Sequence, residues 1–206
     1  MLQLPSSFFQ ATQLTSNVSP DHTLRQIISK RLSIQSMDTQ SNISVKITTL
    51  EVYLNSIFKI LVSENKVKTY LQVLEYGDSV TLSENIPWKL PITKSLSLKW
   101  TLQNEIVMTI INIIICYSLR SNELLTSLVA SNDYRNEAKF LNIFKISKKA
   151  LIYINYLKKQ QLRSDAIVEV SSDFVDFIEI SINISIQSIF LIKTLLILSN
   201  AEFDID

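Results

Sequence analysis

The side chains that usually carry catalysis or bind transition metals are scarce in this sequence. His22 is the only histidine and Cys116 the only cysteine, so neither a catalytic triad nor a typical zinc site can be assembled. Gly77 is the only glycine, which excludes a glycine-rich phosphate-binding loop. The sequence therefore predicts no enzyme, no catalytic residue and no bound cofactor, and His22 is interpreted as a solvated residue in the first turn of a helix.

An acidic group at 173–179 is the one candidate for a metal site. Asp173, Asp176 and Glu179 are spaced to share the first turns of a helix. Oxygen ligands in such a group can bind a cation, but acids also complement the partial positive charge of a helix N-terminus. We favour the second explanation and predict no metal.

Two features of the segment 140–160 could bind a partner protein. Lys145, Lys148 and Lys149 give the predicted helix a basic outer side, which fits an acidic helix, anionic lipid or simply water. Phe140 and Phe144 widen the apolar stripe of this helix, either as part of a groove for an amphipathic partner helix or as ordinary core. The periodicity leaves both alternatives open.

The element that organises the chain is the apolar stretch 102–120, which predicts a helix buried almost all round. Its polar residues lie three or four apart, so we expect only one narrow seam to meet water or polar partners. That seam comprises Glu105, Thr109, Asn112, Cys116 and Arg120.

Four further helices are predicted, at 20–32, 43–62, 134–160 and 173–199. Ser19 and Pro20 suit the start of the first, and Ser171 to Asp173 offer caps for the last. The segment 33–42 is expected to be a connection, 122–132 a polar connection with some helical content, and 200–206 a frayed tail.

The middle of the chain, near residues 67–100, is expected to contain a small β-hairpin or sheet. Tyr70–Tyr76 and Ser79–Leu82 are β-prone and flank a turn at Gly77-Asp78, and 96–100 offers a third short strand. Trp88, between two prolines, is expected to pin this segment to the helices.

Composition is consistent with a mainly α-helical single domain spanning residues 1–206. One glycine and four prolines are too few for a sandwich or barrel, and 20 basic against 19 acidic residues leave no field for nucleic acid. A lone cysteine fits a reducing, intracellular compartment. Because 106–117 and 184–198 are strongly apolar, a small membrane-associated helical protein is the alternative, although a span needs about 20 apolar residues.

Three blocks of this sequence resemble the Bro1-domain family, and within it the fungal pH-response regulators of the PalC type. They are 98–120, in which Leu98-Lys99-Trp100 precedes the apolar helix with its Asn112-Ile113 step, 150–157, which ends in Tyr156-Leu157, and Gln187-Ser188-Ile189-Phe190-Leu191-Ile192-Lys193. Leu4–Ser7, Glu51–Leu54 and Ile86–Trp88 agree in order and spacing. The sequence departs from the family pattern at Asn104, where an aromatic is usual, and at Ser188, where glutamate is usual.

The resemblance implies a scaffold of long antiparallel helices and an adaptor function without catalysis. Its implied partner is the C-terminal helix of an ESCRT-III subunit (Snf7 or Vps32 type), in the ambient-pH (Rim) pathway, with no small-molecule substrate. It also implies a cytoplasmic protein recruited peripherally to endosomal or plasma membrane. By the same resemblance, Phe144 lies near the position that meets the ESCRT-III helix, with Lys145, Lys148 and Lys149 beside it.

The chain resembles only the N-terminal half of a Bro1 domain. If it is a partial domain, we expect the last helix to leave some apolar side chains partly uncovered. These are Ile186, Phe190, Ile197 and Leu198.

Overall fold

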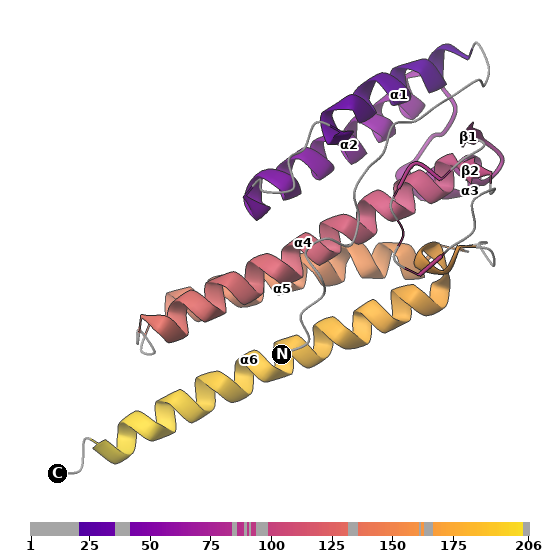
Figure 1. Cartoon of the computed structure of the whole chain (residues 1–206). Coiled ribbons are helices and arrows are strands. Elements are labelled where there is room, and N and C mark those ends of the chain that lie inside the picture. Colours follow the sequence, from indigo (N-terminus) through magenta and orange to yellow (C-terminus); the bar gives the residue numbers. More distant parts are fainter. Residues whose placement is uncertain are drawn as a thin grey trace.

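The computed structural model describes residues 21–35, 42–83, 86–88, 90, 92–93, 99–131, 136–160, 162 and 167–203 (Figure 1). Within them the helices are α1 (His22–Gln35), α2 (Ile43–Ser63), α3 (Val73–Asp78), α4 (Leu102–Ala130), α5 (Glu137–Lys158) and α6 (Ser172–Phe203), with 3-10 turns η1 (Tyr70–Gln72) and η2 (Val168–Val170). Strand β1 (Thr81–Ser83) pairs antiparallel with β2 (Trp100–Thr101). The predicted fold class, mainly helical with a small sheet, is confirmed.

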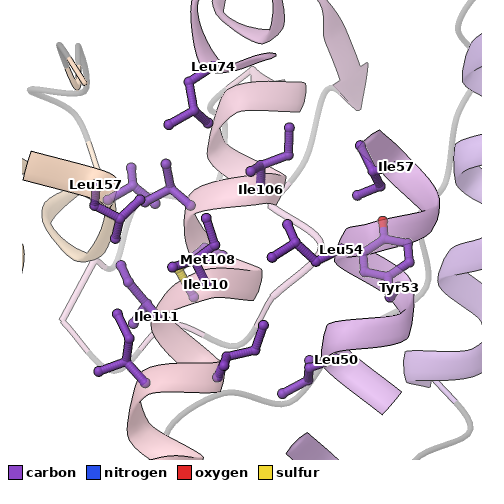
Figure 2. Close-up of a cluster of buried hydrophobic side chains, with 14 of the residues drawn as sticks. Leu50, Tyr53, Leu54, Ile57, Leu74, Ile106, Met108, Ile110, Ile111 and Leu157 are labelled. Carbon is purple, nitrogen blue, oxygen red and sulfur yellow. The ribbon is translucent and has the colours of Figure 1, made fainter. Parts of the chain in front are cut away.

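Helix α4 forms the centre of the molecule and lies between α2 on one side and α5 on the other (Figure 1). The Thr101 hydroxyl caps it by accepting a hydrogen bond from the Asn104 amide at 3.2 Å. Every residue from Leu102 to Ser118 is buried, which agrees with the prediction for the apolar residues and extends burial to the polar seam as well. Figure 2 shows side chains of α4 packed against those of α2, α3 and α5 in one continuous core.

The polar seam of α4 is buried in the bundle from Glu105 to Cys116 and not exposed to solvent. Glu105 and Thr109 are fully buried, and Asn112 and Cys116 are nearly so. The Thr109 hydroxyl and the Asn112 amide each donate to the backbone carbonyl four residues earlier, which satisfies them inside the helix. Of the seam, only Arg120 is half-buried, and it pairs with Glu123.

The prediction that this helix ends near Arg120 is wrong, because α4 continues to Ala130. The segment 122–132, expected to be a connection, contains Leu125 and Leu128, and both are buried. With Ser121 they continue the buried face at steps of four and three. These two leucines pack in a second, smaller core cluster with residues of α5 and α6, so the segment continues the buried face of α4 instead of connecting it to α5.

Helices α1 and α2 pack against each other and cover one side of α4. The apolar stripe predicted for α2 is confirmed from Ile47 to Leu61, whereas Ile43 is only half-buried. The Asp21 carboxylate caps α1 by accepting a hydrogen bond from the Thr23 amide at 3.0 Å, and this bond lowers the pKa of the carboxyl. Ser19 and Pro20 lie outside the described residues, as do Leu4–Ser7.

The predicted strand at Tyr70–Tyr76 is wrong, because this segment forms η1 and the start of α3. Val73, Leu74 and Gly77 are its buried residues, and their spacing suits a helix. Gly77 is therefore not a turn residue. A Cβ atom there would lie 2.7 Å from the backbone nitrogen of Gln103, so glycine permits α3 to touch the first turn of α4.

The sheet forms from the later part of that region. Thr81 pairs with Thr101, and Ser83 pairs with Trp100 across an irregular register. Of the third strand expected at 96–100, residues 96–98 lie outside the described part, and β2 begins at Trp100.

Helices α4, α5 and α6 follow one another with alternating direction (Figure 1). The Ser171 hydroxyl caps α6 by accepting from the Phe174 amide at 3.2 Å, as expected. The helix nevertheless extends to Phe203, so the predicted tail is helical in its first residues. The bounds of the helix predicted at 134–160 differ as well, because α5 begins at Glu137 and ends at Lys158.

Two described helices are long and apolar enough to cross a membrane, and they are buried to very different extents. In α4, 89% of the apolar window is buried inside the bundle, whereas in 172–195 of α6 only 28% is. The extensive burial of α4 is typical of the core helix of a soluble bundle. The expected uncovered side chains on α6 are present, since Phe190, Ile197 and Leu198 are each half exposed or more and Ile186 is half-buried.

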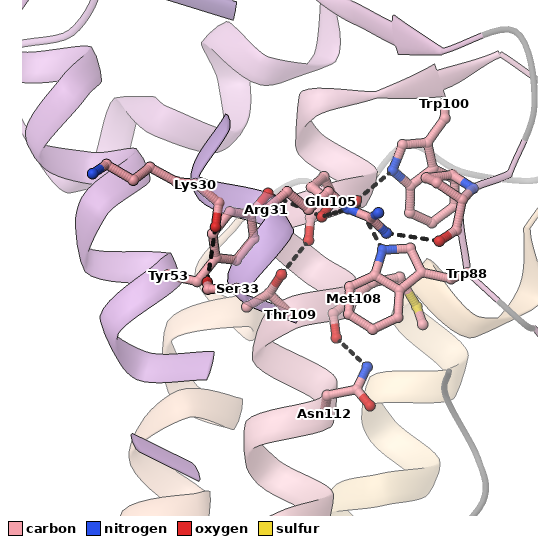
Figure 3. A network of polar contacts seen from close by, with 11 residues as sticks. Lys30, Arg31, Ser33, Tyr53, Trp88, Trp100, Glu105, Met108, Thr109 and Asn112 are labelled. Atoms are coloured by element: carbon pink, nitrogen blue, oxygen red, sulfur yellow. Dashed lines mark hydrogen bonds and ion pairs between the residues drawn. The ribbon is translucent and has the colours of Figure 1, made fainter. Parts of the chain in front are cut away.

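A buried carboxylate joins the N-terminal elements to α4 (Figure 3). Oε1 of Glu105 accepts hydrogen bonds from Arg31 Nε at 2.7 Å and from the Tyr53 hydroxyl at 3.1 Å. Oε2 accepts from the indole N–H groups of Trp88 at 2.8 Å and Trp100 at 2.9 Å. This contact confirms that Trp88 pins its segment to the helices, and the burial of Tyr53 raises the pKa of its hydroxyl well above the ordinary value.

The cationic partner in this cluster is buried as well. The side chain of Arg31 is 1% exposed, and its Nη2 donates to the carbonyl oxygen of Pro87 at 2.7 Å. Its guanidinium carbon lies 5.2 Å from the centre of the Trp88 ring. A buried ion pair is tolerated when its remaining hydrogen-bonding groups are satisfied, and both carboxylate oxygens of Glu105 are.

We predict that Arg31→Ala lowers the free energy of unfolding by about 3–5 kcal/mol, because it leaves the buried Glu105 carboxylate without its counter-ion. Urea unfolding followed by circular dichroism measures this loss. The exposed neighbour Lys30 is the matched control, and Lys30→Ala should change the free energy by no more than about 0.5 kcal/mol. A loss for Arg31→Ala as small as that of the control would contradict the role assigned to the pair.

Candidate functional site

The candidate binding residues lie on α5, whose ends are well defined. The Asn136 side chain accepts a hydrogen bond from the Lys139 amide at 3.2 Å, and Glu137 and Lys158 complement the helix dipole at opposite ends. The buried face of α5 recurs at steps of three and four against α4. It consists of Phe140, Ile143, Ser147, Ala150, Ile154 and Leu157.

Phe144 sits at the margin of this face and is half-buried. Its ring stacks on Phe190 of α6 with 4.2 Å between ring centres and 30° between planes. The Phe190 side chain is itself 55% exposed. Phe144 is thus neither fully core nor fully surface, and the aromatic pair forms an apolar edge where α5 meets α6.

The three lysines do not share one position around the helix. All are exposed, but Lys148 lies four residues after Phe144 and therefore on the same face, with Lys145 beside it. Lys149 turns towards α4, where its Nζ lies 5.5 Å from the centre of the Tyr117 ring. The structure thus brings Phe144 together with Lys148 and separates both from Lys149.

Another cation, from α6, lies at the same edge. Lys193 Nζ is 5.7 Å from the centre of the Phe140 ring and 3.9 Å from Glu137, whose side chain is largely exposed. We call Phe144, Phe190, Lys148 and Lys193 together the α5–α6 edge. Sequence reasoning did not assign Phe190 and Lys193 to this site, because the periodicity of one helix carries no information about which residues of another helix lie beside it.

A polar cluster on the other side of α5 links it to α2. Oε1 of Glu51 accepts hydrogen bonds from the hydroxyls of Tyr117 at 2.6 Å and Tyr153 at 2.9 Å. Burial, reinforced by the Glu51 carboxylate, raises the pKa of both hydroxyls well above the ordinary value. The two tyrosines therefore remain protonated donors at physiological pH, and the cluster acts as a structural tie across α4.

The acidic group of α6 is occupied by a lysine side chain. Lys158 Nζ lies 3.0 Å from Asp176 and 2.5 Å from Glu179, and these hydrogen bonds raise the pKa of the ammonium group. Asp173 remains in the first turn of the helix. In the part of the chain that the structure describes, no three His, Cys, Asp or Glu side chains are grouped so as to hold a metal ion.

His22 is exposed, with Nδ1 3.6 Å from a Glu64 carboxylate oxygen and 3.2 Å from the Gln26 amide nitrogen. Cys116 is buried in α4, and desolvation raises the pKa of its thiol to about 11. Neither residue contributes to the α5–α6 edge.

Fold and site together define a helical bundle with an apolar, cationic edge. A sequence profile described as a family of unknown function (DUF5355) matches residues 100–206, from β2 through α6, and the chain belongs to that family. The matched region contains Glu105 and all residues of the α5–α6 edge. No curated protein and no solved structure matches the chain.

We predict that Cys116 of the folded protein reacts with a thiol reagent at pH 8 at least 100-fold more slowly than a free thiol. A pKa of about 11 leaves roughly one thiol in a thousand ionised at pH 8, against about one in four at the ordinary pKa. Val52→Cys places an exposed thiol on α2 as the control and should react rapidly. Absorbance of released thionitrobenzoate measures both rates, and fast labelling of native Cys116 would show that the core helix is accessible.

Proposed function

We propose that this protein is a non-catalytic adaptor of ambient-pH (Rim) signalling that binds the C-terminal helix of an ESCRT-III subunit of the Snf7 or Vps32 type. The observation that carries this proposal is the α5–α6 edge, where two stacked aromatic rings remain partly exposed beside lysines. An apolar platform with flanking cations suits an amphipathic helix that has acids beside its apolar face.

The sequence blocks that resemble Bro1 domains support the same proposal through their positions. They fall on α4, α5 and α6, three helices that pack in succession, and the Gln187–Lys193 block contains both Phe190 and Lys193. Phe144, the residue placed near the partner by the resemblance, stacks directly on that block. The sequence resemblance and the side-chain geometry therefore both lead to the α5–α6 edge. A cytoplasmic adaptor of this kind would be recruited with its partner to endosomal or plasma membrane.

The aromatic and the lysine side chains of the α5–α6 edge contribute differently to recognition. Phe144 and Phe190 supply the apolar contact that limits dissociation, since aromatic residues often carry most of the energy of an interface. Lys148 and Lys193 attract the acids of an approaching helix and so affect mainly the association rate. Lys149, which lies over Tyr117, contributes least, and Lys145 has an intermediate position.

The membrane-associated alternative depends on α6, because the apolar segment of α4 is enclosed in the bundle. On α6 the flanking charges in the first turns are acidic, at Asp173, Asp176 and Glu179. Helices that lie on anionic membranes carry basic residues there instead. The adaptor function is therefore the better supported of the two.

We predict that Phe190→Asp lowers the affinity for a synthetic C-terminal helix of the ESCRT-III subunit at least tenfold while leaving helix content unchanged. The ring is exposed enough for the new carboxylate to be solvated, so folding is preserved, whereas the apolar contact is lost. Fluorescence anisotropy of the labelled peptide and circular dichroism measure the two effects. Phe144→Asp should act in the same direction with some loss of stability, because this ring is half-buried.

Val52→Asp is the matched control, since it introduces the same charge at an exposed apolar position on α2. It should bind as the unaltered chain does. Equal binding by Phe190→Asp and the unaltered chain would remove the α5–α6 edge as the docking site. No binding by the unaltered chain would reject this partner altogether.

We further predict that Lys148→Glu weakens the same interaction more at low salt than at high salt. Exposed ion pairs contribute about 1 kcal/mol or less and are screened by salt. Lys149→Glu should have a smaller effect because its ammonium group lies towards Tyr117. Titrations at two ionic strengths measure the difference, and equal effects of the two reversals would contradict the geometry proposed here.

A further inference from the structure

A second exposed apolar surface runs along α6, separate from the α5–α6 edge. Its large apolar residues are each between 44% and 60% exposed. They follow one another at helical steps on a different side of α6 from its buried residues Ile178 and Ile189, and at one end the ring of Phe177 stacks 6.1 Å from that of the buried Phe174. We call them the α6 stripe: Phe177, Ile180, Ile184, Leu191, Leu195 and Leu198, with Gln187 and Ser188 at the centre.

The spacing of the stripe is that of a helix–helix seam. Phe177, Ile184, Leu191 and Leu198 are separated by seven residues each, which is the heptad repeat. Figure 1 shows α6 as the outermost layer of the bundle, beyond α4 and α5. A helix is therefore the occupant whose shape this surface fits.

The stripe is also self-complementary. Read from Phe177 to Leu198 through the two central polar residues, the steps are three, four, three, one, three, four and three, which is the same in both directions. If two copies of α6 cross antiparallel about the midpoint between Gln187 and Ser188, every apolar residue of one stripe meets an apolar residue of the other. Phe177 then faces Leu198, Ile180 faces Leu195, and Ile184 faces Leu191 of the second copy.

The centre of this arrangement has matching polar groups. The Ser188 hydroxyl donates to the Ile184 carbonyl at 2.9 Å, so its oxygen remains free to accept. The Gln187 side chain is exposed, and its amide N–H can donate to Ser188 of the second copy. One polar pair at the centre of an apolar seam selects a single register.

Charge disfavours an anionic lipid surface as the occupant. Between Glu179 and Glu202 the only charged residue is Lys193, which lies off the stripe and pairs with Glu137. The stripe from Phe177 to Leu198 is therefore uncharged, and the acids that flank it, Asp173 and Glu202, fall opposite each other at the ends of the antiparallel seam and also repel anionic lipid. Six large side chains about half exposed present roughly 600 Å² per copy, so two copies bury about 1,200 Å², the lower end of the range for specific interfaces.

We propose that the chain forms a two-fold symmetric homodimer through antiparallel contact of the α6 stripe. This goes beyond the adaptor function and is independent of it, because Phe190 lies on a different side of α6 from the stripe and Phe144 lies on α5. A dimer presents two α5–α6 edges and would bind a polymeric partner with higher avidity than a monomer does.

Analytical ultracentrifugation of the 206-residue chain tests the proposal. The mass should rise from 23.6 kDa towards twice that value between about 1 and 100 µM, the range expected for a small interface. Ile184→Glu and Leu191→Glu should each weaken dimerisation at least tenfold with unchanged circular dichroism, because both residues are exposed in the single chain. Val52→Glu, at an exposed position on α2, should dimerise normally.

Cysteine variants test the direction of packing. In the antiparallel dimer, a mixture of Ile180→Cys and Leu195→Cys chains treated with an added mild oxidant forms an intermolecular disulfide, whereas neither variant does so alone. A parallel seam would give the opposite result and overturn the proposal. A monomeric chain throughout the concentration range would also overturn it, as would flotation of a monomer with phosphatidylcholine vesicles, which would make lipid the occupant.

Discussion

The carboxylate of Glu105 accepts hydrogen bonds from four side chains that come from α1, α2, the segment at 86–88 and β2. Without it the Tyr53 hydroxyl and the two indole N–H groups would lose this acceptor in the core, and the carboxylate would be intolerable there without its donors. The positions of α1, α2, the segment at 86–88 and β2 relative to the start of α4 are therefore all tied to one side chain. Hydrophobic burial alone would permit these helices to slide, whereas directional hydrogen bonds select one arrangement.

Helical periodicity predicted the faces of the elements better than their ends. The stripe from Ile47 to Leu61 and the fully buried stretch of α4 agree with the structure, because a repeated three-and-four spacing has one structural explanation. The predicted boundary near Arg120 was wrong because the polar run that follows it, Ser121 to Glu123, is short, and the leucines after that run pack against residues of α5 and α6. The strand predicted at Tyr70–Tyr76 was wrong because β-propensity measures how well a side chain fits a half-buried surface and does not determine the backbone conformation.

The residues of the candidate site could be predicted only where the sequence of a single helix was enough to identify them. Phe144 and the lysines were identified from α5 alone, and the excess width of its apolar face proved to result from stacking on Phe190. The division of the lysines between two sides could not be foreseen in the same way, since Tyr117 belongs to another helix. Likewise, the sequence marked Glu105 as part of a polar seam but contained no indication that Arg31, 74 residues earlier, would meet it.

Gly77 has a consequence for this arrangement that follows from its contact with α4. Since the absent Cβ is what allows α3 to approach the Gln103 backbone, any larger residue would push the first turn of α4 outward or along its axis. Glu105 is two residues further on, so the same displacement would move its oxygens relative to both indole donors. The lack of a side chain at Gly77 thus fixes how closely α3 approaches α4, and through that distance it fixes the position of the buried Glu105 carboxylate along α4.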